Sequence, residues 1–364
     1  MTRVGIVGGG QLGRMLALAG YPIGIRCTTL DPAADSPASQ VAPAVVGAYD
    51  DLEALDRLAA DADVVTYEFE NVPVAAAEHV AERVPVYPAP GSLDVAQDRL
   101  TEKRRFEAVG LQVPPYRPVG SLADLDTALV EIGTPAVLKT RRLGYDGKGQ
   151  AVIRDPARAE DAWRAVGEVP AVVESFVDFD AEVSIVAARG RDGAIACYPV
   201  VQNHHREGIL RLTLAPAPDL APALQAAAEA HARALMEDLR YVGVLAIELF
   251  VVGDTLLGNE FAPRVHNSGH WTIEGAETSQ FEQHLRAVTG RPLGPTGMIG
   301  VAAMVNLIGS EPAPEAVAAI PGAHLHTYGK VPRPGRKLGH ITVRTTQMRA
   351  LEAPLLQVQS LLDD

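Results

Sequence analysis

The sequence predicts a multidomain protein of mixed α/β and α+β class, with an open parallel α/β domain first and a small β-rich domain last. Three observations support this prediction. Strand and helix signals alternate from residue 1 to about 95, short strands surround a glycine-rich loop in the middle, and residues 291–364 combine prolines with a basic segment. A chain of 364 residues is also longer than the size at which one core usually stops growing.

The N-terminal prediction rests on three apolar runs. The segment RVGIVGGGQLGRMLALA gives a strand, a turn and a helix, IGIRCTTLD ends a second strand at Asp31, and ADVVTYEFE at 62–70 is a third buried strand. The following VYPAPGSL is rich in proline and glycine. We therefore place the first domain at 1–95.

The middle domain, predicted at 96–290, contains an α+β subdomain and a long hairpin. Short apolar strands flank the loop RRLGYDGKGQ, which is too polar to pack, so we expect a mobile lid subdomain at about 115–178. A helix from about Pro222, with Asp219 as a candidate N-cap, precedes the strand VGVLAIELFV. That strand turns back at Gly253-Asp254. Residues 291–364 form the predicted C-terminal domain.

The composition excludes several classes of protein. With 47% hydrophobic and 21% charged residues the chain can bury a core, and its net charge of −13 opposes general affinity for nucleic acid or anionic membranes. Cys27 and Cys197 are far apart, so neither a disulfide framework nor a cysteine zinc site is indicated, which fits a reducing cytoplasm. Glycines and Arg14 interrupt the apolar N-terminus, so we expect neither a signal peptide nor a membrane span.

The glycine turn after the first strand fits the dinucleotide pattern GxGxxG. Gly8, Gly10 and Gly13 supply the glycines, and Asp31 ends the next strand. Alone this suggests a nicotinamide dehydrogenase. Glycines at a helix N-terminus bring backbone N–H groups close to any anion, however, including a sugar phosphate.

Two carboxylates on the predicted hairpin indicate a metal site. Glu248 in LAIELFV and Glu260 in LLGNEFAPR are nearly equidistant from the turn, so they can face the same side. Two carboxylates 4 Å apart repel by about 4 kcal/mol at an effective dielectric of 20, and a magnesium ion that also binds ATP phosphates would relieve this. The alternative is that one glutamate pairs with a structural arginine.

A glycine-rich loop and a lysine point to phosphate binding. The loop 144–149 offers flexible backbone donors and Lys148, and Lys139 ends an apolar strand just before it, where it needs an anion. A solvated surface loop and an internal salt bridge are the respective alternatives.

Histidines and a basic run give weaker signals. His266 and His270 are four residues apart, and His204 adjoins His205, but Asn-Ser-Gly between the first two opposes a helical zinc site, so hydrogen-bonding roles are favoured. The segment YGKVPRPGRKLGH at 328–340 concentrates cations in an acidic chain and is a candidate phosphate clamp, with a solvated basic edge as the alternative.

Together these motifs resemble a known family, the N5-carboxyaminoimidazole ribonucleotide synthetases, which are ATP-grasp enzymes of purine biosynthesis. The resemblance runs end to end. Its motifs are GIVGGGQLGRML at the start, TYEFENVP at 66–73, QDRLTEK at 97–103, GYDGKGQ at 144–150, NEFAPRVHNSGHWTIEG at 259–275 and YGKVPRPGRKLGHITV at 328–343.

The resemblance implies an ATP-grasp fold, an ATP-dependent ligase and a magnesium requirement. Bicarbonate would attack the γ-phosphate of ATP to give carboxyphosphate and ADP. The 5-amino group of aminoimidazole ribonucleotide would then be carboxylated, directly or through released CO2. The small-molecule partners implied are this ribonucleotide and bicarbonate, without nucleic acid or membrane, in a cytoplasmic homodimer.

The family pattern also implies roles for individual residues. Phosphates would be held by Arg99, Lys139, Gly144, Tyr145, Asp146, Gly147, Lys148 and Gly149. Glu174, Ser175, Phe176 and Val177 would line the adenine, Glu182 would accept the ribose hydroxyls, and His205 would lie beside the nucleotide. Glu248 and Glu260 would bind magnesium with Asn259 adjacent, and Arg264 would orient bicarbonate and the developing carboxyphosphate. The ribonucleotide would be held by Gln11, Leu12, Glu68, Asn267, Lys330, Arg336 and Lys337, its phosphate meeting the last three.

One position departs from the wider superfamily. Many ATP-grasp enzymes have asparagine two residues after the second magnesium glutamate, where this chain has Ala262. The metal would therefore rest on Glu248, Glu260 and phosphate oxygens. The nearest alternative is a formate-dependent glycinamide ribonucleotide transformylase, which HNSGHWT and EFENVP disfavour. A non-catalytic nucleotide-binding protein of the same fold is a second alternative.

Overall fold

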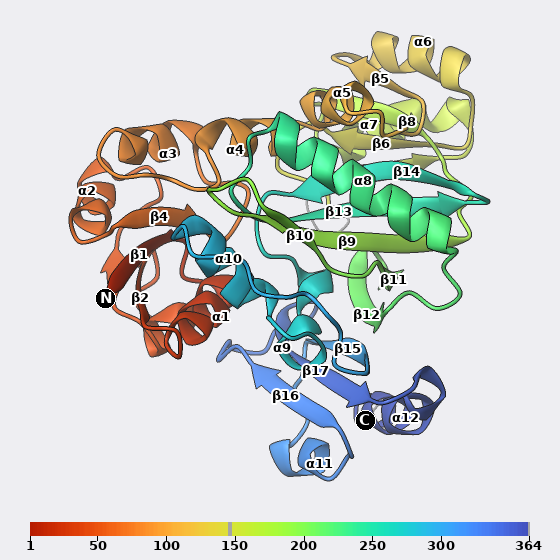
Figure 1. Cartoon of the computed structure of the whole chain (residues 1–364). Helices are drawn as coiled ribbons and strands as arrows, with labels where there is room; N and C mark the ends of the chain where they lie inside the picture. Colours follow the sequence, from red (N-terminus) through yellow and green to blue (C-terminus); the bar gives the residue numbers. More distant parts are fainter. Residues whose placement is uncertain (145–147, 363–364) are drawn as a thin grey trace.

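Figure 1 shows the computed structural model of the chain, which describes residues 1–144 and 148–362. The N-terminal part is a four-stranded parallel sheet in the order β3-β2-β1-β4, which confirms the predicted open α/β architecture. Helices pack on both faces, so β4 is buried along its whole length. Its elements are β1 (Thr2–Val7), α1 (Gln11–Gly20), β2 (Ile25–Asp31), η1 (Pro37–Gln40), β3 (Ala44–Val46), α2 (Leu52–Ala60), β4 (Val64–Tyr67), α3 (Val74–Ala81) and α4 (Pro90–Ala96).

A small antiparallel sheet, at the upper right of Figure 1, follows helix α5 (Arg99–Ala108). Its strand order is β5-β8-β6-β7, and two helices cover it around a separate core that contains Leu138 and Trp163. Its elements are β5 (Tyr116–Val119), α6 (Leu122–Ile132), β6 (Ala136–Thr140), β7 (Gln150–Ile153), η2 (Pro156–Arg158), α7 (Ala159–Ala165) and β8 (Ala171–Ser175).

The largest layer is a nine-stranded sheet in the order β14-β13-β9-β11-β12-β15-β17-β16, with β10 paired to β9. The C-terminal strands β15, β17 and β16 continue this sheet. Its strands are β9 (Ala181–Arg189), β10 (Ile195–Cys197), β11 (Val201–Arg206), β12 (Ile209–Ala215), β13 (Gly243–Val252), β14 (Thr255–Ala262), β15 (Val301–Ile308), β16 (Ala323–Thr327) and β17 (Lys337–Thr345). The associated helices are α8 (Pro222–Asp238), η3 (Asn267–Gly269), α9 (Thr272–Gly275), α10 (Gln280–Val288), α11 (Pro314–Ala318), η4 (Met348–Ala350) and α12 (Glu352–Ser360).

Helix α8 crosses one face of the central sheet, as Figure 1 shows. The helix packs on Leu245, Ile247 and Leu249, whereas their neighbours Val244 and Ala246 face the core on the opposite side. Because side chains alternate along a strand, Glu248 projects from the face opposite α8. On β13 the face under α8 is therefore apolar, and the opposite face carries Glu248.

The start of α8 differs from the prediction. Asp219 has φ 56° in a turn before the helix, and the N-cap is Ala221, which has no capping side chain. Pro222 occupies the first turn, where a missing N–H costs nothing. The proposed Asp219 cap is therefore wrong.

Helix α10 joins the N-terminal part to the central sheet. It packs against α1 on one side and against β9 and β13 on the other. Its His284 is fully buried; Val244 N–H donates to Nδ1 at 3.1 Å and Nε2 lies 2.8 Å from the Thr66 hydroxyl. Nδ1 is therefore an acceptor, and burial lowers the pKa of His284 to about 3.

We expect His284 to make stability depend on pH. A histidine whose folded pKa lies below its unfolded value of about 6.5 adds stability above pH 6.5 that is lost as pH falls. From pH 7.5 to 5 the wild-type chain should lose about 2 kcal/mol of unfolding free energy through this residue. Urea unfolding at pH 7.5 and pH 5 measures this loss. The decrease in unfolding free energy between the two pH values should be smaller by that amount in His284→Gln. Equal losses in the two proteins would contradict this assignment.

Candidate active site

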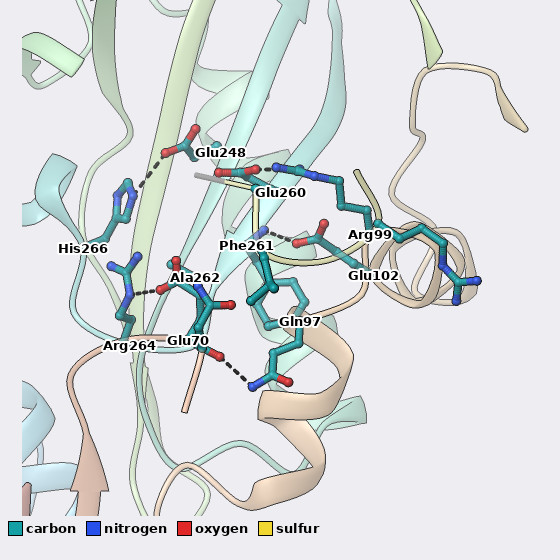
Figure 2. A pocket seen from close by; sticks show the side chains of 15 residues that line it. Glu70, Gln97, Arg99, Glu102, Glu248, Glu260, Phe261, Ala262, Arg264 and His266 are labelled. Atoms are coloured by element: carbon teal, nitrogen blue, oxygen red, sulfur yellow. Dashed lines mark hydrogen bonds and ion pairs between the residues drawn. The ribbon is translucent and has the colours of Figure 1, made fainter. Parts of the chain in front are cut away.

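Figure 2 shows a cavity lined by the central sheet, the N-terminal part and the start of α5. The register of the β13–β14 hairpin sets Glu248 directly opposite Glu260, as the sequence predicted. Ser184 on β9 pairs with Glu248 from the other side. Directly paired residues of antiparallel strands share a face, so both carboxylates project into the cavity.

The two glutamates have different partners. Arg99 Nη1 donates to Glu260 at 2.8 Å, and His266 Nε2 lies 3.2 Å from Glu248 Oε1. Burial raises the pKa of Glu260, but the Arg99 guanidinium outweighs it and the net shift is downward. Burial, and then the charge of Glu260, raise the pKa of Glu248 to about 7. The predicted alternative of an arginine pair thus holds for Glu260, while Glu248 faces the imidazole of His266.

This pair fits a divalent cation. Glu102 adds a third carboxylate nearby: burial, then Glu260, raise its pKa to about 8, and it accepts from the Phe261 N–H at 2.6 Å. Several acids held at unfavourable pKa values beside one another are relieved by a cation. Within the described ranges no group of three or more His, Cys, Asp or Glu side chains could hold a metal by itself. Magnesium needs only one or two carboxylates plus phosphate oxygens, so this pair would suffice for it.

Arg264 lies at the wall of the same cavity. It forms an ion pair with Glu70 and donates to the Val265 carbonyl at 3.0 Å. Gln97 fixes the Glu70 segment, since its amide donates to the Glu70 carbonyl at 2.8 Å. The guanidinium is thereby oriented by a residue from the N-terminal part, 194 positions away in sequence.

Lys139 lies in a network of buried charges. Its ammonium donates to Glu174 at 3.1 Å and to the Asn259 side-chain oxygen at 3.2 Å. Lys103, which is 1% exposed, contacts the same Glu174 oxygen at 3.1 Å. Burial raises the pKa of Glu174, but Lys139 and then Lys103 lower it to about 2. Two lysines thus share one carboxylate, and burial lowers the pKa of Lys103.

The segment from Glu174 to Val177 connects the small sheet to the central one (Figure 1). Ser175 and Phe176 use their N–H groups for the carbonyls of Pro115 and Pro135. On the next strand, Glu182 accepts from His205 Nδ1 at 2.6 Å. Burial lowers the pKa of His205, but this hydrogen bond outweighs it and the net shift is upward.

The structure describes only the two ends of the predicted phosphate loop. Gly144 lines the cavity, and Gly149 accepts from the Thr140 N–H at 2.8 Å through its carbonyl. Lys148 lies between them in the described part of the chain. Tyr145, Asp146 and Gly147 lie outside the described residues.

The glycine turn binds protein carboxylates. Glu68 accepts from the N–H groups of Gly10 and Gly13, and Asp31 accepts from Gly9 at 2.9 Å. Gly8 has φ 112°, and a Cβ there would lie 2.3 Å from Glu68. The anion position at the helix N-terminus is therefore filled from within the chain. The N–H groups that a dinucleotide pyrophosphate would need at this turn are thus engaged by Asp31 and Glu68.

The predicted ribonucleotide residues separate into two groups. Lys330 donates to Gln11, and Asn267 forms reciprocal amide hydrogen bonds with buried Asn306 at 2.7 and 3.0 Å. Lys337 on β17 lies close enough to lower the pKa of Glu70 after Arg264 does. The remaining three lie differently: Glu68 accepts from the glycine turn, Leu12 is buried in the apolar core, and Arg336 donates to the Val331 carbonyl in its own loop at 3.0 Å.

Three charged residues of the site, Glu70, Glu102 and Lys103, escaped the sequence interpretation, and His266 was assigned only a hydrogen-bonding role. The sequence contains motifs that could have indicated these residues. Glu70 lies in TYEFENVP, Glu102 and Lys103 end QDRLTEK, and His266 follows Arg264 by two residues. Their partners, however, come from distant segments.

Known proteins share this arrangement over the whole chain. Three family models match in succession: a ribonucleotide synthetase preATP-grasp domain at 1–97, an ATP-grasp domain at 104–281, and a phosphoribosylaminoimidazole carboxylase C-terminal domain at 302–354. The chain is 50% identical over 361 residues to an N5-carboxyaminoimidazole ribonucleotide synthase of Pseudomonas aeruginosa, covering 99% of each protein.

Solved structures agree. An N5-carboxyaminoimidazole ribonucleotide synthetase from Thermus thermophilus superposes with a TM-score of 0.96 at 55% identity, covering 99% of both chains. An N5-carboxyaminoimidazole synthase from Aspergillus clavatus, in complex with ADP and 5-aminoimidazole ribonucleotide, gives a TM-score of 0.93 at 31% identity and covers 100% of this chain and 98% of that one.

We expect Glu174→Gln to lower the free energy of unfolding by about 3–5 kcal/mol, because it leaves buried Lys103 uncompensated. Lys103→Met in the same chain should recover part of the loss. Urea unfolding measures both. Glu131→Gln is the control, since its ion pair with Arg117 is half exposed and should be worth at most about 1 kcal/mol. Equal effects of the two Glu→Gln changes would contradict the expectation.

Proposed function

The chain belongs to the N5-carboxyaminoimidazole ribonucleotide synthetase family, whose members are ATP-grasp ligases, and we propose which of its residues bind each substrate of the reaction. The reaction is the ATP- and bicarbonate-dependent carboxylation of 5-aminoimidazole ribonucleotide. The observation that carries the assignment to residues is the Glu248–Glu260 pair, because it meets Arg264 and the predicted phosphate loop in one cavity. Related structures hold ATP, or ADP together with 5-aminoimidazole ribonucleotide.

The chemistry joins two transfers. A bicarbonate oxygen attacks the γ-phosphorus of ATP, the bond to the β-phosphate oxygen breaks, and ADP leaves with that electron pair. The 5-amino nitrogen then takes the carboxyl carbon of carboxyphosphate, directly or as CO2. Inorganic phosphate leaves and the nitrogen loses a proton. The protein contributes position and charge.

Glu248 and Glu260 would hold magnesium, with Asn259 beside them. When bound, the metal neutralises phosphate charge and polarises the transferred group. Lys139, held by Glu174 and Asn259, and Arg99, held by Glu260, are suited to phosphate oxygens because each is a cation fixed at the cavity. The loop 144–149 would close over the phosphates, with the backbone N–H groups of Gly144, Tyr145, Asp146, Gly147, Lys148 and Gly149 as donors.

The adenine end lies at the connection between the two antiparallel sheets. Glu174, Ser175, Phe176 and Val177 would line the base, and Glu182 would accept the ribose hydroxyls. The hydrogen bond from His205 supports this role, because it orients the Glu182 carboxylate while leaving its other oxygen for a hydroxyl.

Arg264 would orient bicarbonate and stabilise carboxyphosphate. A guanidinium presents several N–H donors in one plane, so pairing with Glu70 leaves others for a planar anion. On the amine side, Gln11, Asn267, Lys330 and Lys337 would hold the ribonucleotide. Leu12 would contact the ribonucleotide through its backbone, and Glu68 would contribute by ordering the start of α1. Arg336 would bind the phosphate only after releasing the Val331 carbonyl.

The domain limits and the assembly belong to the same proposal. We place the units at 1–95, 96–290 and 291–364, with a lid at about 115–178; the ranges matched by the three family models support these limits. A cytoplasmic homodimer is the expected state. Among the helices of the described residues, none has the length and apolar character needed to cross a membrane.

The substrate assignment is tested by coupled measurement of ADP release. Turnover should require both 5-aminoimidazole ribonucleotide and bicarbonate. Formate with glycinamide ribonucleotide should give no ADP above the background rate. Activity with the second pair and not with the first would establish the transformylase alternative.

The metal assignment is tested by Glu260→Gln, which keeps the shape of the side chain and removes its charge. We expect ATP cleavage to fall by at least about 100-fold, because magnesium loses one of two carboxylates. Glu78→Gln, an exposed position on α3, is the control and should retain wild-type turnover. Full ATP cleavage by Glu260→Gln would overturn the assignment and favour a different metal site.

A further inference from the structure

A chain of buried polar side chains crosses the central sheet and ends at the glutamate pair. Thr213 on β12, Asn203 on β11, Ser184 on β9 and Ser268 in η3 are each at most 4% exposed. Successive members are hydrogen-bonded: Thr213 to Asn203 at 2.9 Å, Asn203 to Ser184 at 2.9 Å, and Ser184 to Ser268 at 2.7 Å. Ser268 Oγ lies 2.9 Å from His266 Nδ1.

The strand register places this chain on the catalytic face. Asn203 pairs with Thr213 across β11 and β12, and Ser184 pairs with Glu248 across β9 and β13. The neighbouring positions Val186, Val244 and Ala246 on this face are apolar and buried. A row of small polar residues beside such a core needs internal partners for every donor and acceptor.

A contact with the backbone of η3 identifies the direction of each hydrogen bond in the chain. The Ser268 N–H donates to His266 Nδ1 at 3.3 Å, so Nδ1 carries a lone pair. The Ser268 hydroxyl must then donate to Nδ1 and accept from Ser184. Ser184 in turn accepts from the Asn203 amide nitrogen, and the Asn203 oxygen accepts from Thr213. Only one orientation of each group satisfies the whole set.

The same argument locates the imidazole proton. With Nδ1 accepting, a neutral ring carries its proton on Nε2, which faces Glu248 Oε1 at 3.2 Å. The backbone of His266 is fixed as well, because fully buried Gln280 accepts from its N–H at 2.9 Å and donates to its carbonyl at 2.6 Å. Position, ring orientation and tautomer of His266 are thus all determined by neighbours.

We propose that Ser184, Asn203 and Ser268, anchored by Thr213, are positioning residues that hold His266 as the Nε2–H tautomer, so that it donates to Glu248 and orients this carboxylate. The orienting effect rests on the proposed role of Glu248 at the metal. In the other tautomer an Nε2 lone pair would face a carboxylate oxygen and repel it. The hydroxyl and amide chain therefore acts on the metal site without touching it.

The first test reads the tautomer directly, with nucleotide and metal absent. Two-bond ¹H–¹⁵N spectra of the full chain labelled at histidine nitrogens, with His266→Gln identifying the signals, should show the Nε2–H form. Asn203→Asp should shift His266 toward the Nδ1–H form, because an aspartate only accepts and reverses each hydroxyl up to Ser268. Ser184→Ala should mix the two forms, and Ser184→Thr should restore the wild-type spectrum.

The control is Ser92→Ala, since this buried hydroxyl has no hydrogen-bond partner within the described chain. It should leave the His266 signals unchanged. An unchanged tautomer in both Asn203→Asp and Ser184→Ala would overturn the proposal. Ser184→Ala keeps the test decisive if Asn203→Asp does not fold.

The second test is calorimetric titration of magnesium in the presence of a non-hydrolysable ATP analogue. A shift of tautomer should weaken magnesium by about 10-fold, the usual effect of a lost partner behind a metal ligand. Analogue affinity without metal should not change. A tautomer shift with unaltered magnesium affinity would overturn the positioning role. If Glu248→Gln also binds magnesium normally, the proposed metal site has failed, while the tautomer result stands independently.

Discussion

Glu248 and Glu260 lie side by side on paired strands of the central sheet, and much of the surrounding structure compensates for that placement. Arg99 neutralises one carboxylate, while burial and the neighbouring charge keep the other at a raised pKa. The pair is costly without a cation and favourable with one. The two carboxylates of the pair therefore differ in how far the chain compensates their charge.

Basic residues around the cavity are likewise held by buried acidic partners. Lys103 and Lys139 share one Glu174 oxygen, and Lys139 also donates to Asn259, which leaves one of its N–H donors for an incoming anion. Arg264 is held by Glu70 through part of its guanidinium. Cations and acids are thus separately fixed by buried partners. Under the proposed function these groups would be in place before substrate binds, so little reorganisation would be needed during phosphoryl transfer.

The glycine-rich turn illustrates how a motif depends on its surroundings. Gly8, Gly10 and Gly13 have the spacing of a dinucleotide site, and the helix N-terminus does bind an anion, but this anion is Glu68. The local geometry was predictable because glycine spacing and a strand–turn–helix pattern are local properties. The identity of the anion depended on β4 lying next to β1, which brings Glu68 to the turn.

The sequence by itself determined what local patterns encode. Alternation and turn position put Glu248 and Glu260 on one face, and long motifs indicated the family. Only the tertiary structure decided the pairings: Arg264 with Glu70, Lys103 with Glu174, and His266 with a chain of hydroxyl and amide groups from β12, β11, β9 and η3. Each joins elements distant in sequence, and strand order and register are set by the packing of the whole sheet. The Asp219 cap failed for a related reason, because a left-handed turn and Pro222 moved the helix start past it.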